Sequence, residues 1–106
     1  SNVTLSIVVA ELPLIPGAVE LGSNGFRTRA SESNRQFIEG DIDCNNDVDM
    51  EILEIVFDPQ TSGGLLVAIP EEAADQFITL VREFDGYDSS VIGKVEEHSG
   101  KSIQFS

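Results

Sequence analysis

Apolar and small polar residues alternate at the start of the chain, which is the pattern of a β-strand with one buried face. The alternation runs from Val3 to Val9. Leu12–Pro16 carries two prolines, which remove the backbone donors that a central strand needs, so this stretch is not a central strand. Pro16 suits the first turn of a short helix that continues through Leu21 and ends at Gly22.

The next two segments differ in periodicity. No clear period occurs from Gly25 to Gly40, which predicts mostly loop. After it, Asn46 or Asp47 can cap a helix. The face of that helix would be apolar, with Val48, Ile52, Ile55 and Val56 at helical spacing.

The second half of the chain is the more regular. Leu65–Ile69 is a short apolar run between turn formers, which predicts a strand buried on both faces. Ala73–Phe84 has apolar residues at helical spacing and predicts a helix packed across the sheet. Val91–Glu97 and Ser102–Phe105 predict two strands joined by a turn at Ser99-Gly100. The fold class predicted is α+β, in α/β layers, with a mixed sheet of four to five strands and packed helices.

The composition of the chain limits the number of domains, the classes of partner and the cellular location that we expect. A chain of 106 residues predicts one domain, here residues 3–106, since Ser1 and Asn2 resemble the remnant of an expression tag. The net charge of −13 disfavours nucleic acid and anionic membranes as partners. The single cysteine excludes an internal disulfide, and no apolar run approaches the length of a membrane helix. We therefore expect a cytoplasmic location.

The segment FDPQTSGGLLVAIP, residues 57–70, places a polar loop directly before the apolar run. Asp58 precedes a proline and is pushed out of the helical region, so the preceding helix must end there. Gln60, Thr61 and Ser62 offer amide and hydroxyl groups, and Gly63 and Gly64 can adopt positive φ and admit a ligand or another backbone. The alternative is a plain connection whose glycines only make room for packing.

The same segment resembles one near the end of bacterial selenophosphate synthetases, also called selenide, water dikinases. LPLIPGAVELGSNG (residues 12–25), NRQFIE (34–39) and VIGKVEE (91–97) resemble further segments of that family, in the family's order. Where the family usually has Gly-Gly-Thr, this chain has Arg29, Ala30 and Ser31, and its acidic run from Glu39 to Glu51 is poorly matched.

The resemblance implies the C-terminal domain of an enzyme of the aminoimidazole ribotide synthetase superfamily. The intact enzyme would convert selenide, ATP and water to selenophosphate, AMP and phosphate, with its nucleophile, lysine and metal-binding aspartates in an N-terminal ATP-binding domain. The implied partners are that domain and, for the intact enzyme, a second copy. This domain alone would bind no cofactor, hold no catalytic or metal residue and be inactive, whereas the intact enzyme would use ATP and magnesium.

The resemblance also suggests where this domain would meet ligand. The loop Gln60–Gly64 would close the active-site cleft and donate hydrogen bonds to a phosphate or selenophosphate oxygen. Asn34 and Arg35 match the family, and Arg35 could pair with phosphate. Alternatives left open are the equivalent domain of a thiamine monophosphate kinase or a hydrogenase maturation protein, and a stand-alone binding module.

Four other side-chain features could carry chemistry. Asp41, Asp43, Asn45, Asp47 and Asp49 approach a calcium-loop spacing, but Asn46 and Ile52 stand where glycine and glutamate are required. Cys44 lies in this acidic run, which would raise its thiol pKa rather than activate it. His98 is the only histidine and has no partner at ligand spacing, and Ser62 lies in no nucleophile elbow.

Overall fold

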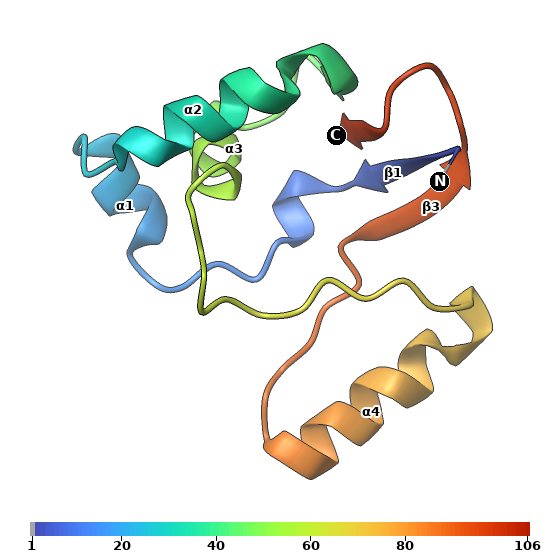
Figure 1. Ribbon diagram of the computed structural model, residues 1–106. Coiled ribbons are helices and arrows are strands. Elements are labelled where there is room, and N and C mark those ends of the chain that lie inside the picture. Colours follow the sequence, from blue (N-terminus) through green and yellow to red (C-terminus); the bar gives the residue numbers. More distant parts are fainter. Residues whose placement is uncertain (1) are drawn as a thin grey trace.

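A computed structural model describes residues 2–106 (Figure 1). Ser1, half of the proposed tag remnant, lies outside the described residues. The strands are β1 (Val3–Ile7), β2 (Ile42–Cys44), β3 (Gly93–Glu97) and β4 (Ile103–Phe105), and the α-helices are α1 (Ala18–Ser23), α2 (Arg29–Ile38), α3 (Met50–Val56) and α4 (Ala74–Asp85). Three single 3₁₀ turns complete the set: η1 (Val9–Glu11), η2 (Glu39–Asp41) and η3 (Glu71–Ala73).

The four strands form one mixed sheet in the order β2-β4-β1-β3. β1 pairs antiparallel with β3 and parallel with β4, and β4 pairs parallel with β2. The register sets Leu5 opposite Val95 on one side and opposite Ile103 on the other. The predicted fold class, a mixed sheet of four to five strands with helices packed on it, is confirmed.

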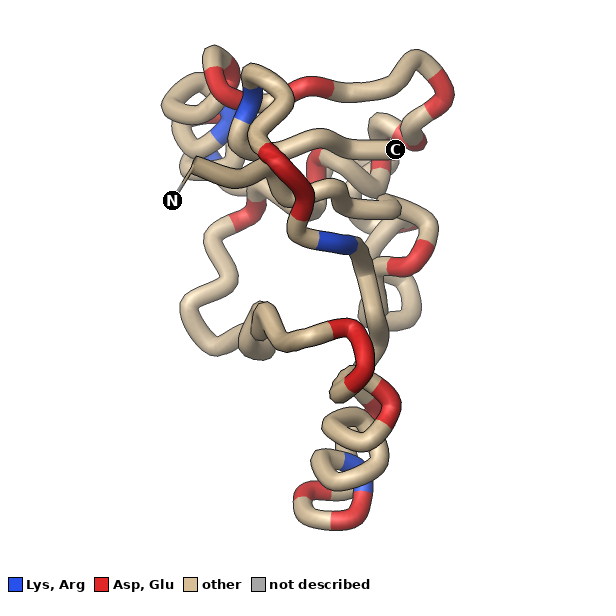
Figure 2. Tube along the Cα trace, turned by 90° about the vertical axis from the view of Figure 1, so that its right-hand side faces the viewer, with Lys and Arg blue, Asp and Glu red and all other residues tan. Residues whose placement is uncertain are grey.

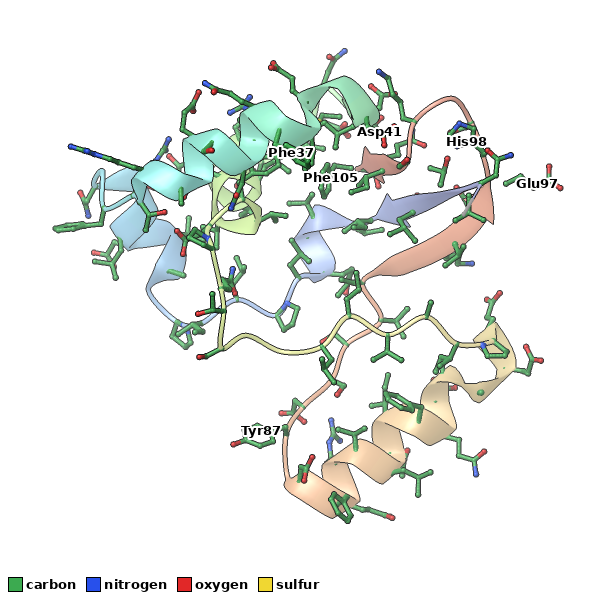
Figure 3. The ribbon with its side chains drawn as sticks, viewed as in Figure 1. Phe37, Asp41, Tyr87, Glu97, His98 and Phe105 are labelled. Atoms are coloured by element: carbon green, nitrogen blue, oxygen red, sulfur yellow. The ribbon has the colours of Figure 1, made fainter. Side chains whose placement is uncertain are left out.

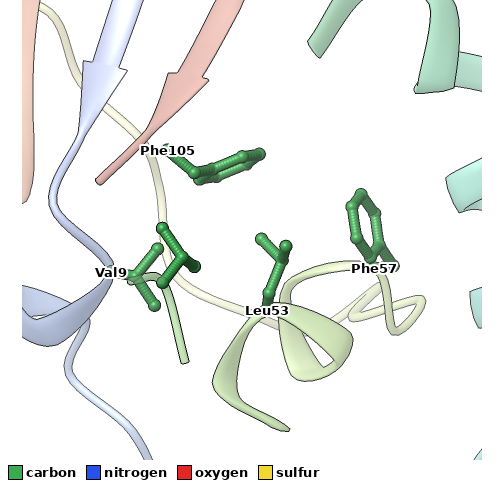
Figure 4. Close-up of a cluster of buried hydrophobic side chains, with 5 residues drawn as sticks. Val9, Leu53, Phe57 and Phe105 are labelled. Atoms are coloured by element: carbon green, nitrogen blue, oxygen red, sulfur yellow. The ribbon is translucent and has the colours of Figure 1, made fainter. Parts of the chain in front are cut away.

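The core lies between one face of this sheet and helices α2 and α3. Its buried members come from η1, α3, the residues that flank α3, and the last strand. They are Val9, Val48, Leu53, Phe57 and Phe105, and Figure 4 shows them converging. Alternation in β1 and β4 delivers apolar side chains to this face and leaves Ser6 and Gln104 on the other. Leu53 has only 1% of its surface exposed, which makes it the centre of the packing.

The turn after β3 is fastened by a buried threonine. Thr4 is 1% exposed, and its hydroxyl donates to the Lys101 carbonyl at 2.6 Å and accepts from the Ser99 amide at 3.0 Å. Gly100 has φ of 99°, a left-handed conformation that suits glycine. The predicted turn between the two strands is instead a crossover, because β3 and β4 lie on opposite sides of β1, and the chain bends at residues 100–102. β1 supplies the hydroxyl that holds this connection.

Residues 25–40 are not mostly loop, as the periodicity predicted, because α2 occupies ten of them. The face of α2 toward the rest of the molecule carries Ser31, Asn34, Arg35 and Ile38, the spacing of a helix but with mainly polar side chains. Phe37, the one large apolar residue besides Ile38, points outward and is exposed (Figure 3). A search for apolar periodicity therefore passes over this helix.

The prediction of a buried strand at Leu65–Ile69 is wrong. These residues form an extended, irregular segment, with Leu65 93% and Leu66 68% exposed. No backbone hydrogen bond joins residues 64–69 to the described part of the sheet. An apolar run between turn formers indicates a preference for burial, but it does not specify which surface buries it.

The helix predicted at Ala73–Phe84 is confirmed as η3 followed by α4, but its predicted packing across the sheet is wrong. Figures 1 and 2 show α4 standing away from the sheet on two linkers. Its apolar side chains Phe77, Leu80 and Phe84 are exposed. The side-chain tie between this region and the sheet is an ion pair, 3.5 Å from Lys94 Nζ on β3 to Glu71 Oε1. We call residues 64–92, from the loop to β3, the arm.

Smaller differences concern the acidic run and helix α3. The run contributes β2, which the sequence patterns did not predict. The cap of α3 is Asp49, whose carboxylate accepts from the amides of Glu51 and Ile52, rather than Asn46 or Asp47. The helix ends at Val56, before Pro59, as predicted. No helix found in residues 2–106 has the length and apolar character required to cross a membrane.

Candidate functional site: the loop after helix α3

The C-terminal turn of α3 is the platform from which the predicted loop starts. The last carbonyl groups of a helix lack partners within the helix and need other donors. Asn34 Nδ2, from α2, donates to the Phe57 carbonyl at 2.9 Å, and Gln60 Nε2 donates to the Ile55 carbonyl at 3.3 Å. Two of the predicted site residues therefore have an observed role in closing the end of this helix.

Arg35 is engaged by the same helix. Its guanidinium is hydrogen-bonded to Glu54 Oε1 and lies 5.9 Å from the centroid of the Phe57 ring. Arg27 contacts the other oxygen of Glu54, at 3.3 Å. A cation near a helix C-terminus also interacts favourably with the negative end of the helix dipole. Arg35 is thus held toward the platform, and a role on phosphate would require it to share its guanidinium with Glu54.

The loop itself, Gln60–Gly64, is exposed throughout. Neither glycine uses the positive φ that glycine can adopt. A Cβ on Gly63 would lie 3.2 Å from the Gln60 carbonyl, in the turn closed by the Gly63 amide, whereas a Cβ on Gly64 would meet no atom within 4 Å. No hydrogen bond of the Thr61 or Ser62 hydroxyl is found within the described chain. These hydroxyls are thus available to an outside group.

Asp58, at the base of the loop, is bound to the start of α2. Its Oδ1 accepts from the Thr28 hydroxyl at 2.9 Å and from the Ser31 hydroxyl at 3.1 Å. Thr28 also caps α2 by accepting from the Ser31 amide at 3.3 Å. Sequence patterns missed this cluster, although a threonine three residues before Ser31 is a capping signal. The positions where the family usually has Gly-Gly-Thr are therefore the first turn of α2.

The acidic run does not form a loop around a common centre. Asp43 accepts from the amide of Cys44 at 3.0 Å, Asp41 accepts from the amide of Ser102 at 3.1 Å, and Asp49 caps α3. Within residues 2–106, no group of three or more His, Cys, Asp or Glu side chains is placed to hold a metal ion. The calcium-loop alternative gains no support from this arrangement.

Cys44 and His98 lie apart from the loop. Burial raises the pKa of the Cys44 thiol, and the neighbouring Asp43 raises it further, while Arg35 acts in the opposite direction. The predicted direction for this thiol is confirmed, with burial rather than the acidic run as the larger cause. His98 directly follows the end of β3, and Figure 3 shows it on the same side of the molecule as Asp41.

Comparison with models of known protein families shows to which family this chain belongs. The family model described as "AIR synthase related protein, C-terminal domain" matches residues 18–106. This chain belongs to that family. The match includes α1 to α4, the loop and the strands β2 to β4, so the predicted superfamily membership is confirmed.

Curated relatives point to one branch of the family. A selenide, water dikinase of Nitratidesulfovibrio vulgaris (strain DP4) is 37% identical over 97 residues, which is 92% of this chain and 27% of the relative. Selenide, water dikinase 2 of Peptoclostridium acidaminophilum is 35% identical over 103 residues, 97% of this chain and 29% of the relative. The chain is thus similar to selenide, water dikinases while spanning less than a third of their length.

Proposed function

We propose that this family member is the C-terminal domain of a selenide, water dikinase, and that its loop Gln60–Gly64 completes the active-site cleft against an N-terminal ATP-binding domain. The intact enzyme would make selenophosphate, AMP and phosphate from selenide, ATP and water. The observation that carries the proposal is the loop: exposed, with the Thr61 and Ser62 hydroxyls turned to no partner in the described chain, and fixed at its base to α2 and α3.

Donors of this kind suit an anionic ligand on an acidic protein. The net charge is −13, and residues 59–70 contain no charged side chain (Figure 2). Hydroxyl groups and the amides of Gly63 and Gly64 can donate to a phosphate or selenophosphate oxygen without a cation. Arg35 would assist only through the part of its guanidinium that Glu54 leaves free.

Magnesium and ATP are not assigned to this chain. Magnesium prefers oxygen ligands from carboxylates together with substrate phosphates, and no cluster of three or more acidic side chains is placed to hold it within residues 2–106. In our proposal the N-terminal domain holds both. The isolated 106-residue chain should then form no selenophosphate, and selenide-dependent ATP consumption by the purified chain would contradict this division of roles.

The arm supplies a surface for that domain. Leu65, Leu66, Phe84, Tyr87 and Val91 are all more than half exposed, and Figure 3 shows Tyr87 pointing outward from the linker after α4. Large apolar side chains exposed together on one segment are typical of an interaction site. The relatives are more than three times as long as the matched region. We propose that the remaining part of such a chain is the partner that covers the arm.

The loop is tested in the intact protein by changing Thr61 and Ser62 together to alanine, which leaves both glycines unchanged. We expect turnover to fall about tenfold or more while the thermal midpoint is preserved, as when positioned donors are removed. Ser33→Ala, an exposed serine on α2, is the matched control and should leave turnover unchanged. Full selenide-dependent activity in the double variant would mean that the hydroxyl groups play no part.

The docking surface is tested by hydrogen–deuterium exchange of residues 64–70. In the intact protein we expect slow exchange, since the partner would cover these amides, and in the 106-residue chain we expect fast exchange. Equal, fast exchange in both would refute the docking. Protection that rises with protein concentration, together with a doubled mass in light scattering, would assign the surface to a second copy instead.

A further inference from the structure

The start of α2 and the end of α3 are joined by one carboxylate. Asp58 Oδ1 accepts two hydroxyl donors, from Thr28 at 2.9 Å and Ser31 at 3.1 Å. Ser31 is 5% exposed, so its hydroxyl has little access to water, and its partners are this carboxylate and the Thr28 hydroxyl, 2.9 Å away. The carboxylate also lies against the N-terminal turn of a ten-residue helix, where the helix dipole favours negative charge.

Asp58 is fixed in its backbone as well as in its side chain. Its amide donates to the Ile55 carbonyl at 3.1 Å, which continues the last turn of α3. Pro59 follows, and its ring restricts both its own φ and the conformation of Asp58. The direction in which the chain leaves α3 is therefore set at these two residues.

A second set of contacts makes the junction rigid. One turn further along α2, Asn34 donates to the Phe57 carbonyl, and Arg35 pairs with Glu54. Ser31, Asn34 and Arg35 follow one another at i, i+3 and i+4, so one face of α2 lies along the final turn of α3. The loop beyond this junction has few contacts of its own, the Gln60 side chain and the Gly63 amide being the ones observed.

We propose that Asp58 is a positioning residue, and that its hydrogen bonds to Thr28 and Ser31 set the orientation of the loop Gln60–Gly64. The inference rests on the proposed function of that loop for its effect on turnover, but not for its effect on the loop's conformation. Without the carboxylate, the Thr28 and Ser31 hydroxyls keep only each other as side-chain partners, the start of α2 loses its link to residue 58, and the loop loses its fixed base.

The conformational part is tested by hydrogen–deuterium exchange in the intact protein. Asp58→Ala should raise the exchange rate of residues 60–64 at least severalfold, while peptides from α4 stay unchanged. Asp58→Asn, which keeps an oxygen acceptor of the same shape, should restore most of the protection. Asp47→Ala, an exposed aspartate outside the junction, is the control. Unchanged exchange of residues 60–64 in Asp58→Ala overturns the proposal.

The link to turnover is tested by combining variants. If Asp58 acts through the loop hydroxyls, Asp58→Ala should lower turnover about tenfold in the parent and add little to the Thr61→Ala, Ser62→Ala variant, because residues that act as a unit are not additive. If the loss of turnover in the combined variant equals the product of the two separate losses, Asp58 does not act through these hydroxyls and the positioning role is overturned. If the double variant alone is fully active, the proposed function of the hydroxyls fails, and the exchange experiment still decides the role of Asp58. If Asp58→Ala does not fold, Ser31→Ala, which removes one of the two hydroxyl donors to Asp58, serves for both measurements and should change exchange and turnover in the same direction.

Discussion

Substitutions at two leucines, one in the observed core and one in the apolar segment that sequence patterns predict to be buried, test where the core lies. Leu53 is 1% exposed and packs among Val9, Phe57 and Phe105, whereas Leu66 is 68% exposed in the arm. Leu53→Ala removes buried methyl groups and leaves a cavity, which costs about 3–5 kcal/mol in well-packed cores. Fully burying a leucine is worth about 1.5–3 kcal/mol, so the one-third of Leu66 that is covered accounts for about 0.5–1 kcal/mol.

The assay is urea unfolding of the 106-residue chain followed by circular dichroism. With a slope of about 1.5 kcal/mol per molar urea, Leu53→Ala should lower the midpoint by about 2 M or more, and Leu66→Ala by about 0.7 M or less. Because a small domain has a total stability of only about 5–15 kcal/mol, Leu53→Ala can remove the folded baseline altogether. Leu53→Met, a change of similar volume with an expected cost below about 1.5 kcal/mol, then supplies the comparison.

The refuting result is a Leu66→Ala loss as large as that of Leu53→Ala in the isolated chain. It would mean that residues 65–69 are buried in the domain, as the apolar run alone suggests. The same substitution in the intact protein is a separate measurement. If the arm docks there as proposed, Leu66→Ala should cost more in the intact protein than in the isolated chain.

Three further predictions concern single sites. Gly93→Ala should destabilise the chain strongly, because the added Cβ would lie 2.0 Å from the Ser6 carbonyl oxygen across the β1–β3 pair. The control is Gly64→Ala, whose Cβ would meet no atom within 4 Å and which should leave the thermal midpoint unchanged. Equal thermal midpoints for the two variants would contradict this prediction. Hydrogen bonds from Ser102 lower the pKa of Asp41 below its ordinary 3.8, so Asp41 stabilises the fold above pH 3.8 and this contribution is lost as the pH falls through the lowered value. Urea titrations should show Asp41→Asn less stable than the parent at neutral pH, with the difference shrinking in acid; a constant difference would refute the assignment. Burial raises the pKa of the Cys44 thiol, so its alkylation by iodoacetamide should have a pH midpoint above that of the urea-unfolded chain, and coinciding midpoints would count against it.

Local signals in the sequence predicted the elements well where an apolar period and a stop signal coincide. β1 and α4 follow from alternation and helical spacing, and the end of α3 follows from Pro59. α2 could not be found in this way, because its inward face is polar and is satisfied by contacts to α3 rather than by burial of apolar area. The prediction of a buried strand at Leu65–Ile69 failed for the opposite reason. The composition of this segment favours burial, but which surface covers it depends on tertiary contacts that a local pattern does not contain.

The candidate site shows the same division. The sequence pointed to Asn34, Arg35 and the loop as neighbours through a family resemblance, and the structure brings the first two to the end of α3, where the loop begins. Their partners, the Phe57 carbonyl and Glu54, carry no signal in a linear motif, because each contact joins residues about twenty positions apart. Thr28 and Ser31 reach Asp58 across a similar separation.

The arm carries a helix with an apolar face, and much of that face is exposed in the isolated domain. α4 has twelve residues, a length at which an isolated helix is marginal in water, and most helical stability in proteins comes from packing of an apolar face. Yet Phe77, Leu80 and Phe84 are exposed. The observed ties of the arm are a solvent-exposed ion pair to β3, of a kind worth about 0–1 kcal/mol, and one backbone hydrogen bond, from the Val8 amide to the Ile92 carbonyl at 2.8 Å. The exposed part of this apolar helical face would gain stability from a cover. A covering domain next to residues 59–70 would also meet the longest uncharged stretch of a chain with net charge −13. The segment that gains from burial and the segment that can admit an anion are therefore continuous.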